Sequence, residues 1–139
     1  MNKEYRMLLQ SIITSTNDSI TKQVKKYGLN QGQVDYLVLI AKYPNINQLD
    51  LTKKKKVGKA SVTKALKLLE VNGFISREVD PYDKRNFMCT VTTKGEHIIS
   101  DLIQIKRQTT KILFSDFTKE EMDVFYSQLI KLEKNANKL

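Results

Sequence analysis

Residues 59–91 read KASVTKALKLLEVNGFISREVDPYDKRNFMCTV, and the spacing of their apolar residues changes partway along. The first part repeats apolar residues every three or four positions, as an α-helix does, and ends in Asn72-Gly73, a pair typical of a left-handed helix end. The second part alternates polar and apolar residues in FISREV and FMCTV, which is typical of strands, and the turn-rich DPYDKRN lies between them. This stretch therefore predicts a helix followed by a β-hairpin with a polar, basic tip.

Hydrophobic periodicity extends the prediction to both ends of the chain. Three helices begin at capping-box pairs: Asn30 with Gln33, Thr93 with Glu96, and Thr118 with Glu121. The predicted helices cover 4–26, Asn30 to Pro44, 47–55, 59–72, 94–114 and 119–136, and the strands cover 74–79 and 87–91. The fold class is mainly α with a small β-hairpin, in the order α-α-α-α-β-β-α-α. The apolar run 98–105 leaves additional strand open as an alternative, but the capping pair before it favours a helix.

Composition limits the classes of protein to consider. The 139 residues suit one domain, and no run of about 18 apolar residues predicts a membrane span. The first residues lack the apolar core and cleavage site of a secretory signal, and a single cysteine cannot form an internal disulfide, so we expect a cytoplasmic protein. A net charge of +9 suits a nucleic-acid partner, although an acidic protein or an anionic membrane would also attract it.

Three helices followed by a hairpin form the winged helix-turn-helix order, in which the second helix of the pair enters the DNA major groove. That helix is 59–72. At 100° per residue Val62, Leu66 and Leu69 fall on one side and the polar residues on the other. The predicted DNA-binding residues of this helix are Lys59, Ala60, Ser61, Thr63, Lys64 and Lys67. The alternative is an ordinary solvated helix face.

The hairpin tip is the second predicted DNA-binding element. Asp83, Lys84 and Arg85 are expected at its apex. An arginine on a protruding wing suits a narrow A·T minor groove, where the negative potential is strongest. We expect Asp83 to hold Arg85 or Arg77 by a charge-assisted hydrogen bond. The alternative is a solvated turn with a local ion pair.

Three motifs together resemble the MarR family of bacterial winged-helix transcription regulators. They are SVTKALKLLEVNGFI, DPYDKR and VTTKGE, and the flanking helices extend the resemblance over nearly the whole chain. It implies that Lys59, Ala60, Ser61, Thr63 and Lys64 begin a recognition helix, that Arg85 enters the minor groove, and that Asp83 supports it. These expectations match those drawn from the residues themselves.

The resemblance also implies a homodimer that binds a pseudo-palindromic operator in double-stranded DNA, more often as a repressor. Residues 1–28 and 94–139 would form the dimerisation region, and residues 29–93 the DNA-binding lobe. Independently, residues 98–132 carry more apolar side chains than one small lobe needs, although a larger monomeric core would also explain them. In the family an effector pocket often lies between these regions, so a small-molecule effector is a candidate partner.

Three positions depart from the family pattern. Lys55 stands where leucine is usual, so its ammonium must reach water or the turn must open. Lys56 stands where a turn residue is common. Gly58 stands where serine often caps the recognition helix, which costs only a few tenths of a kcal/mol.

The remaining residues with functional chemistry are isolated. Cys89 is predicted as a half-buried strand residue, and His97 has no companions at metal-ligand spacing. No phosphate loop or nucleophile–base motif is present, so we expect no enzyme activity, cofactor or metal. Two alternatives to a specific regulator are a winged-helix module that binds protein and a non-specific nucleoid-type DNA binder.

Overall fold

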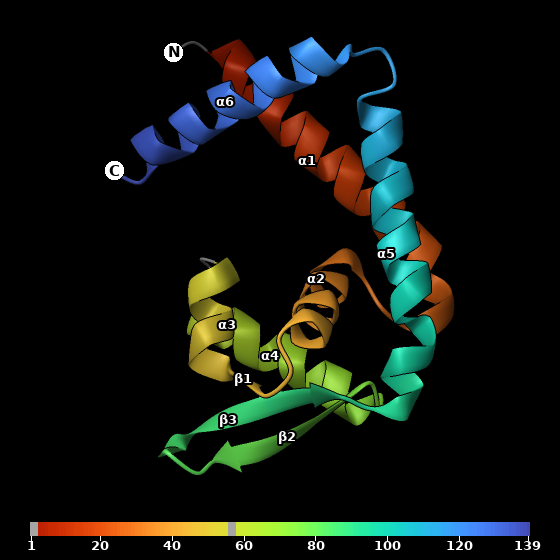
Figure 1. Cartoon of the computed structure of the whole chain (residues 1–139), viewed down its shortest axis with the longest axis vertical. Coiled ribbons are helices and arrows are strands. Elements are labelled where there is room, and N and C mark those ends of the chain that lie inside the picture. The colour runs from red at the N-terminus through yellow and green to blue at the C-terminus, as the bar shows by residue number, and fades with distance from the viewer. Residues whose placement is uncertain (1–2, 56–57) are drawn as a thin grey trace. The chain divides into compact units, whose positions relative to one another are not determined.

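The computed structural model describes residues 3–55 and 58–139 (Figure 1). Its elements are α1 (Lys3–Val24), the 3-10 helix η1 (Lys25–Tyr27), α2 (Gln31–Lys42), β1 (Ile46–Asn47), α3 (Gln48–Lys55), α4 (Lys59–Val71), β2 (Ile75–Asp80), β3 (Asp83–Val91), α5 (Thr93–Leu113) and α6 (Lys119–Ala136). The backbone divides into two compact units, Met1–Arg107 and Gln108–Leu139. The predicted class, mainly α with a hairpin wing, is confirmed.

The first unit contains the helix-turn-helix, α3 and α4, and the wing, β2 and β3. In Figure 1 the helices α2, α3 and α4 lie on one side of the sheet. Its core is formed by side chains that are at most 9% exposed, drawn from every element around it: Ile20, Val24, Leu29, Val34, Tyr36, Leu37, Ile40, Ile46, Leu51, Val62, Leu66, Leu69, Phe74, Ile75, Cys89, Ile98, Leu102 and Ile105. The capping box of Asn30 and Gln33 at the start of α2 is confirmed.

The sheet contains a strand that the sequence did not predict. Residue 46, expected in a connection, and residue 47, expected to begin the helix 47–55, form β1 and pair with β3 antiparallel, Ile46 opposite Cys89 and Asn47 opposite Met88. The sheet order is therefore β1-β3-β2. Two residues are too few to show an alternating pattern, so only the distant partner strand reveals the pairing.

The hairpin tip also differs from the prediction. The turn is confined to Pro81 and Tyr82, and β3 begins at Asp83, so the three expected apex residues lie just beyond the apex. Val79 pairs with Phe87 but Asp80 pairs with Asp83, so residues 84–86 have no partners opposite them. This irregularity explains why the segment carries turn-forming residues although it belongs to a strand.

The wing joins α5 through a cap one residue earlier than predicted. The Thr92 hydroxyl accepts a hydrogen bond from the Gly95 backbone N–H at 3.2 Å and donates one to the Gly73 carbonyl at 2.5 Å. Thr92, not Thr93, therefore caps α5. Thr92 is favoured as the N-cap because its hydroxyl also bonds the chain just after α4, where Gly73 adopts the predicted left-handed conformation with φ 79°.

The second unit holds the end of α5 and all of α6. The capping box of Thr118 and Glu121 is confirmed. The Phe114 ring lies 5.1 Å from the Phe117 ring and 5.8 Å from the Phe125 ring, centroid to centroid. Across residues 3–55 and 58–139 we find no helix with the length and apolarity needed to span a bilayer.

Candidate nucleic-acid interface

The two faces of α4 are as the periodicity predicted. Val62, Leu66 and Leu69 are fully buried. The six side chains proposed to face DNA are all exposed: Lys59, Ala60, Ser61, Thr63, Lys64 and Lys67. The structure thus brings the six onto one accessible surface, while their contact with DNA stays a prediction.

The start of α4 carries no side-chain cap. Gly58 is the N-cap residue, and its carbonyl accepts hydrogen bonds from the backbone N–H groups of Ser61 at 3.1 Å and Val62 at 3.3 Å. Because glycine has no side-chain acceptor, the first-turn N–H groups face outward with the positive end of the helix dipole, which favours an anion. Lys56, the other predicted departure in this turn, lies outside the described residues.

A polar network that the sequence did not reveal ties α3, α4 and β2 together. Gln48 donates through Nε2 to the Thr63 hydroxyl at 2.8 Å and accepts through Oε1 from Arg77 at 3.5 Å. Arg77 also forms a two-pronged ion pair with Glu70, Nη2 to Oε1 at 3.1 Å and Nε to Oε2 at 3.3 Å. Thr63 is therefore held in one orientation on the exposed face of α4. The Thr63–Gln48 contact carries no sequence signal, because it joins two helices whose relative placement is set by the core.

The wing residues Asp83, Lys84 and Arg85 are all exposed, and they follow directly after the turn of the hairpin. Asp83 accepts a hydrogen bond from the Arg85 backbone N–H at 3.1 Å. The expectation that it holds Arg77 is wrong, because Arg77 is paired with Glu70. Among the described residues no ion pair joins Asp83 to the Arg85 guanidinium either, so Asp83 shapes the backbone of the wing instead.

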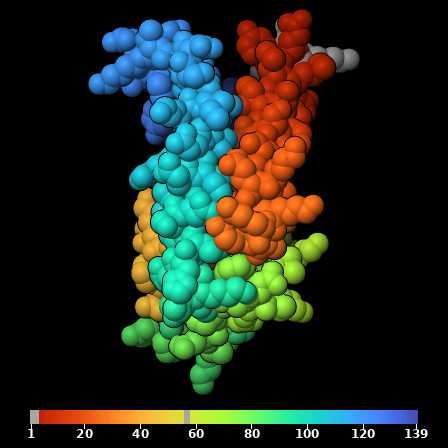
Figure 2. All heavy atoms as spheres, turned by 90° about the vertical axis from the view of Figure 1, so that its right-hand side faces the viewer, coloured from red at the N-terminus to blue at the C-terminus, as the bar shows by residue number. Residues whose placement is uncertain are grey.

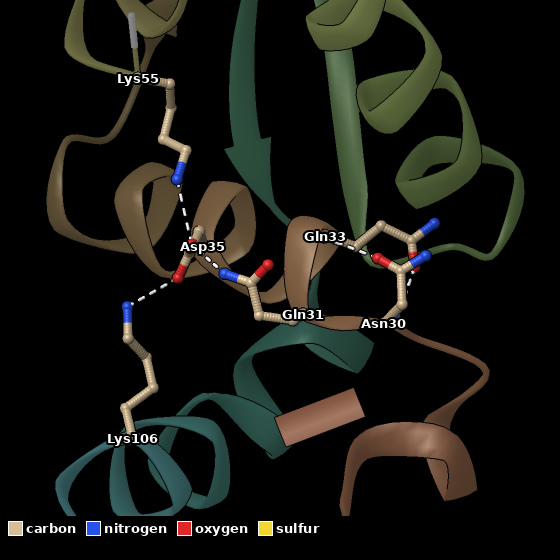
Figure 3. Close-up of polar contacts among 6 residues, drawn as sticks. All are labelled: Asn30, Gln31, Gln33, Asp35, Lys55 and Lys106. Atoms are coloured by element: carbon tan, nitrogen blue, oxygen red, sulfur yellow. Dashed lines mark hydrogen bonds and ion pairs between the residues drawn. The ribbon is translucent and has the colours of Figure 1, made fainter. Parts of the chain in front are cut away.

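An ion pair accommodates the ammonium of Lys55 at the position where the resemblance leads one to expect leucine. Its Nζ lies 3.0 Å from Oδ2 of Asp35 (Figure 3). The other carboxylate oxygen of Asp35 lies 2.8 Å from Nζ of Lys106. Burial raises the pKa of Asp35, but the hydrogen bonds from Lys106 and Lys55 outweigh burial and hold that pKa below its ordinary value.

A second polar contact joins η1, which directly follows α1, to the first half of α5; the two segments lie side by side in Figure 2. The Tyr27 hydroxyl donates to the Asp101 carboxylate, and Lys26 approaches the same carboxylate at 3.5 Å. The bond from Tyr27 lowers the pKa of Asp101 and raises the pKa of Tyr27 itself. This contact, too, was not predicted.

The remaining reactive side chains form no site. Cys89 is fully buried, and burial raises the pKa of its thiol to about 11. His97 is exposed on α5. Within the described part of the chain no three His, Cys, Asp or Glu side chains are grouped to hold a metal ion.

Comparison with known proteins identifies the fold family. A profile of the MarR family matches residues 29–87. The HTH-type transcriptional regulator YybA of Bacillus subtilis (strain 168), itself uncharacterized, is 31% identical over 91% of this chain and 85% of its own length. The MarR protein of Peptoclostridium difficile is 29% identical with a TM-score of 0.93, covering 98% of this chain and 89% of that one.

A MarR family regulator of Listeria monocytogenes, solved in complex with a 26mer DNA, is 25% identical with a TM-score of 0.88, covering 97% of this chain and 89% of that one. The relatives match the chain from end to end, including the helices outside the winged-helix lobe. Proteins of this family are transcription regulators and not enzymes. The helix-turn-helix, the wing and the sequence similarity together show that this chain belongs to the MarR family of DNA-binding transcriptional regulators.

Proposed function

We propose that the protein is a homodimeric bacterial repressor that acts in the cytoplasm and binds a pseudo-palindromic operator, occluding a promoter. The observation that carries this proposal is the accessible face of α4, where three lysines and a threonine oriented by Gln48 lie opposite a fully buried apolar face. A helix presented in this way fits the major groove. The Listeria relative solved with DNA supports the same partner.

The α4 side chains divide into two roles. Lys59, at the uncapped start of the helix, is placed to bind a phosphate. Lys64 and Lys67, further along the exposed face, can contact phosphates or the acceptor edge of guanine. Thr63 can present its methyl group to thymine because Gln48 and the Lys59 carbonyl already bond its hydroxyl at 2.8 and 2.9 Å.

The wing would bind the adjacent minor groove. Arg85 is exposed, and Asp83 fixes its backbone N–H, so the guanidinium extends from a defined point. Lys84 beside it adds positive charge. A narrow A·T-rich minor groove attracts these cations most strongly, which predicts A·T pairs at the outer ends of each half-site.

Exposed apolar side chains on α1 and α6 support the dimer. No residue of α6 is buried in the single chain. Large apolar residues that are 37–68% exposed recur along both helices: Tyr5, Met7, Leu8, Ile12 and Ile13 on α1, and Met122, Val124, Phe125, Tyr126, Leu129, Ile130 and Leu132 on α6. So large an apolar surface requires covering, and a second copy of the chain would provide it.

A small-molecule effector would relieve repression if it bound preferentially to a dimer whose two α4 helices no longer match the half-site spacing. Such a ligand shifts the population of dimers only by the difference between its affinities for the two geometries. A relieving ligand and operator DNA should therefore weaken each other's binding by the same factor.

The experiment that tests this function is selection of bound sites from random duplex DNA. We expect a pseudo-palindrome whose half-sites lie about one helical turn, or a multiple of it, apart. Enrichment of no sequence, with equal affinity for a scrambled duplex, would instead indicate a non-specific binder. Failure to bind any duplex at low salt would favour the protein-interaction alternative.

Single variants then test the assigned residues. Arg85→Ala should weaken operator binding strongly. Lys64→Ala should weaken it and reduce the slope of log affinity against log salt by roughly one. Lys22→Ala removes an equally exposed lysine from α1 and serves as the control. If Arg85→Ala and Lys64→Ala both bind the operator like the wild type and the control, α4 and the wing do not read DNA.

A further inference from the structure

The Asp35 carboxylate is a junction of three helices. It lies on α2 and accepts hydrogen bonds from Gln31 of the same helix at 2.5 Å, from Lys55 of α3 at 3.0 Å and from Lys106 of α5 at 2.8 Å. Figure 3 shows the two lysines approaching from opposite sides of the carboxylate. A single side chain thus connects the helix-turn-helix to α5.

The Asp35–Lys55 pair is largely shielded from water, whereas Lys106 is more open. The side chain of Asp35 is 17% exposed, that of Lys55 25% and that of Lys106 39%. An ion pair in such surroundings holds its geometry more firmly than a surface pair, and loss of one partner leaves a poorly solvated charge behind. The Lys55 ammonium also lies 5.7 Å from the centre of the Tyr36 ring, which restricts it further.

The place of Lys55 in the chain connects the junction with DNA reading. Lys55 is the last residue of α3, and α4 begins at Lys59. Because Gly58 offers no side-chain cap, the start of α4 depends on the core and on the anchored end of α3 for its orientation. Ser61 and Lys64, on the proposed DNA-facing surface, line the same hollow as Asp35 and Lys55.

We propose that Asp35 is a positioning residue for sequence recognition, which holds the end of α3 and thereby the start of α4 in the geometry that reads the operator. Through Lys106 it fixes both to α5. This role rests on the proposed operator binding and adds to it a residue that never touches DNA. A movement of α5 would therefore act on the recognition helix through the contacts of Asp35 with Lys106 and Lys55.

The substitution Asp35→Asn distinguishes a positioning role from a simple charge effect, because the two predict opposite changes in affinity for the operator. Removal of a negative charge from a DNA-binding lobe by itself strengthens binding to every duplex. Loss of positioning should instead lower affinity for the selected operator on the order of tenfold, the factor that a misplaced base contact removes. Affinity for a scrambled duplex should stay constant or rise.

Glu78→Gln is the matched control, since it removes one exposed negative charge from the same lobe. It should change operator and scrambled affinities by the same factor and leave their ratio constant. Lys55→Met should also lower the ratio, and the double variant should be no worse than Asp35→Asn alone, because Lys55 acts through its contact with Asp35. Asp35→Glu, which keeps the charge, should recover part of the ratio.

The proposal is overturned if Asp35→Asn keeps the wild-type ratio, or if its effect multiplies with that of Lys55→Met. Should Asp35→Asn fail to fold by circular dichroism, the ratios of Lys55→Met and Asp35→Glu decide in the same way. A wild-type protein that prefers no duplex would refute the operator function itself. If the wild type prefers the operator and the Asp35→Asn variant prefers it by the same ratio, only the positioning role is refuted.

Discussion

The close approach at Gly95 predicts that even a methyl group there destabilises the fold. Gly95 lies in the first turn of α5, beneath the end of the wing. A Cβ atom at this position would meet the Phe74 carbonyl oxygen at 2.3 Å and Cγ1 of Val91 at 2.6 Å. Comfortable contacts of these kinds are about 3.3 Å and 3.5 Å or longer, so Gly95→Ala must move backbone by roughly 1 Å.

The size of the effect follows from what must move. The Phe74 carbonyl accepts a hydrogen bond from the Thr92 N–H at 3.0 Å, so its displacement weakens the cap of α5 as well. Overpacking of this kind costs about 1–3 kcal/mol and the weakened hydrogen bond about 1 kcal/mol more, while alanine in a helix returns up to about 1 kcal/mol. We expect a net loss of about 1–3 kcal/mol, or roughly 3–10 °C in melting temperature.

The assay is equilibrium unfolding of wild type and variant at one fixed protein concentration, because association shifts apparent stability. Gly32→Ala is the matched control. Gly32 also lies in the first turn of a helix, but its added Cβ would meet only Oδ1 of the Asn30 side chain, at 3.3 Å, and no backbone atom of another segment. The control should stay within about 1 kcal/mol of wild type. A Gly95→Ala protein as stable as the Gly32→Ala protein would refute the packing argument.

Three further predictions follow from the titrating and capping groups. Because burial raises the pKa of the Cys89 thiol to about 11, iodoacetamide at pH 8 should alkylate it only upon unfolding, and a rate independent of denaturant would contradict this. Because the pKa of Asp35 is lowered in the folded protein, its ionised carboxylate stabilises the fold above the ordinary aspartate pKa of about 3.9, and this stability is lost as pH falls through the pKa of the folded state. The free energy of unfolding of Asp35→Asn, measured below pH 4, should therefore fall less steeply with decreasing pH than that of the wild type. Thr118→Ala removes one half of a capping box and should cost about 1 kcal/mol, seen as faster hydrogen exchange at the Glu121 amide; unchanged exchange would show that the cap is dispensable.

The sequence predicted those features that arise from local patterns. The order of the helices, the buried and exposed faces of α4 and two of the three capping boxes all follow from the spacing of neighbouring residues. In place of the third box α5 has a single cap at Thr92, since Gly95 offers no side chain to complete a box. The Thr92 hydroxyl also bonds the Gly73 carbonyl, a group brought near only by the folded wing. The spacing of neighbouring residues cannot predict which of two adjacent threonines caps a helix when the choice depends on an acceptor distant in the sequence.

The features that the sequence did not predict depend on contacts between distant segments. Lys55 lies 20 residues from Asp35 along the chain, and Lys106 lies 71 residues from it. Because the carboxylate that pairs with Lys55 is so distant in the sequence, the lysine alone predicts only a charged residue in a core position. Gln48, Thr63 and Arg77 are likewise ordinary polar residues in the sequence and become a network only in the fold. The exposure of the α4 residues predicted to face DNA followed from the sequence because the buried apolar residues share the other face of the helix.

The pairing of β1 with β3 determines where the wing can bend. Met88 and Cys89 of β3 are held between two strands, and the Asn45 N–H adds a hydrogen bond to the Cys89 carbonyl at 3.1 Å, so this part moves with the segment that enters α3. Beyond Phe87 the strand has β2 alone for support, and the irregular residues 84–86 interrupt even that ladder. The wing is thus supported on both sides at residues 88 and 89 and on one side only near its tip. Under the proposed mode of DNA binding, the tip would adjust to grooves of different width while the recognition helix keeps its register.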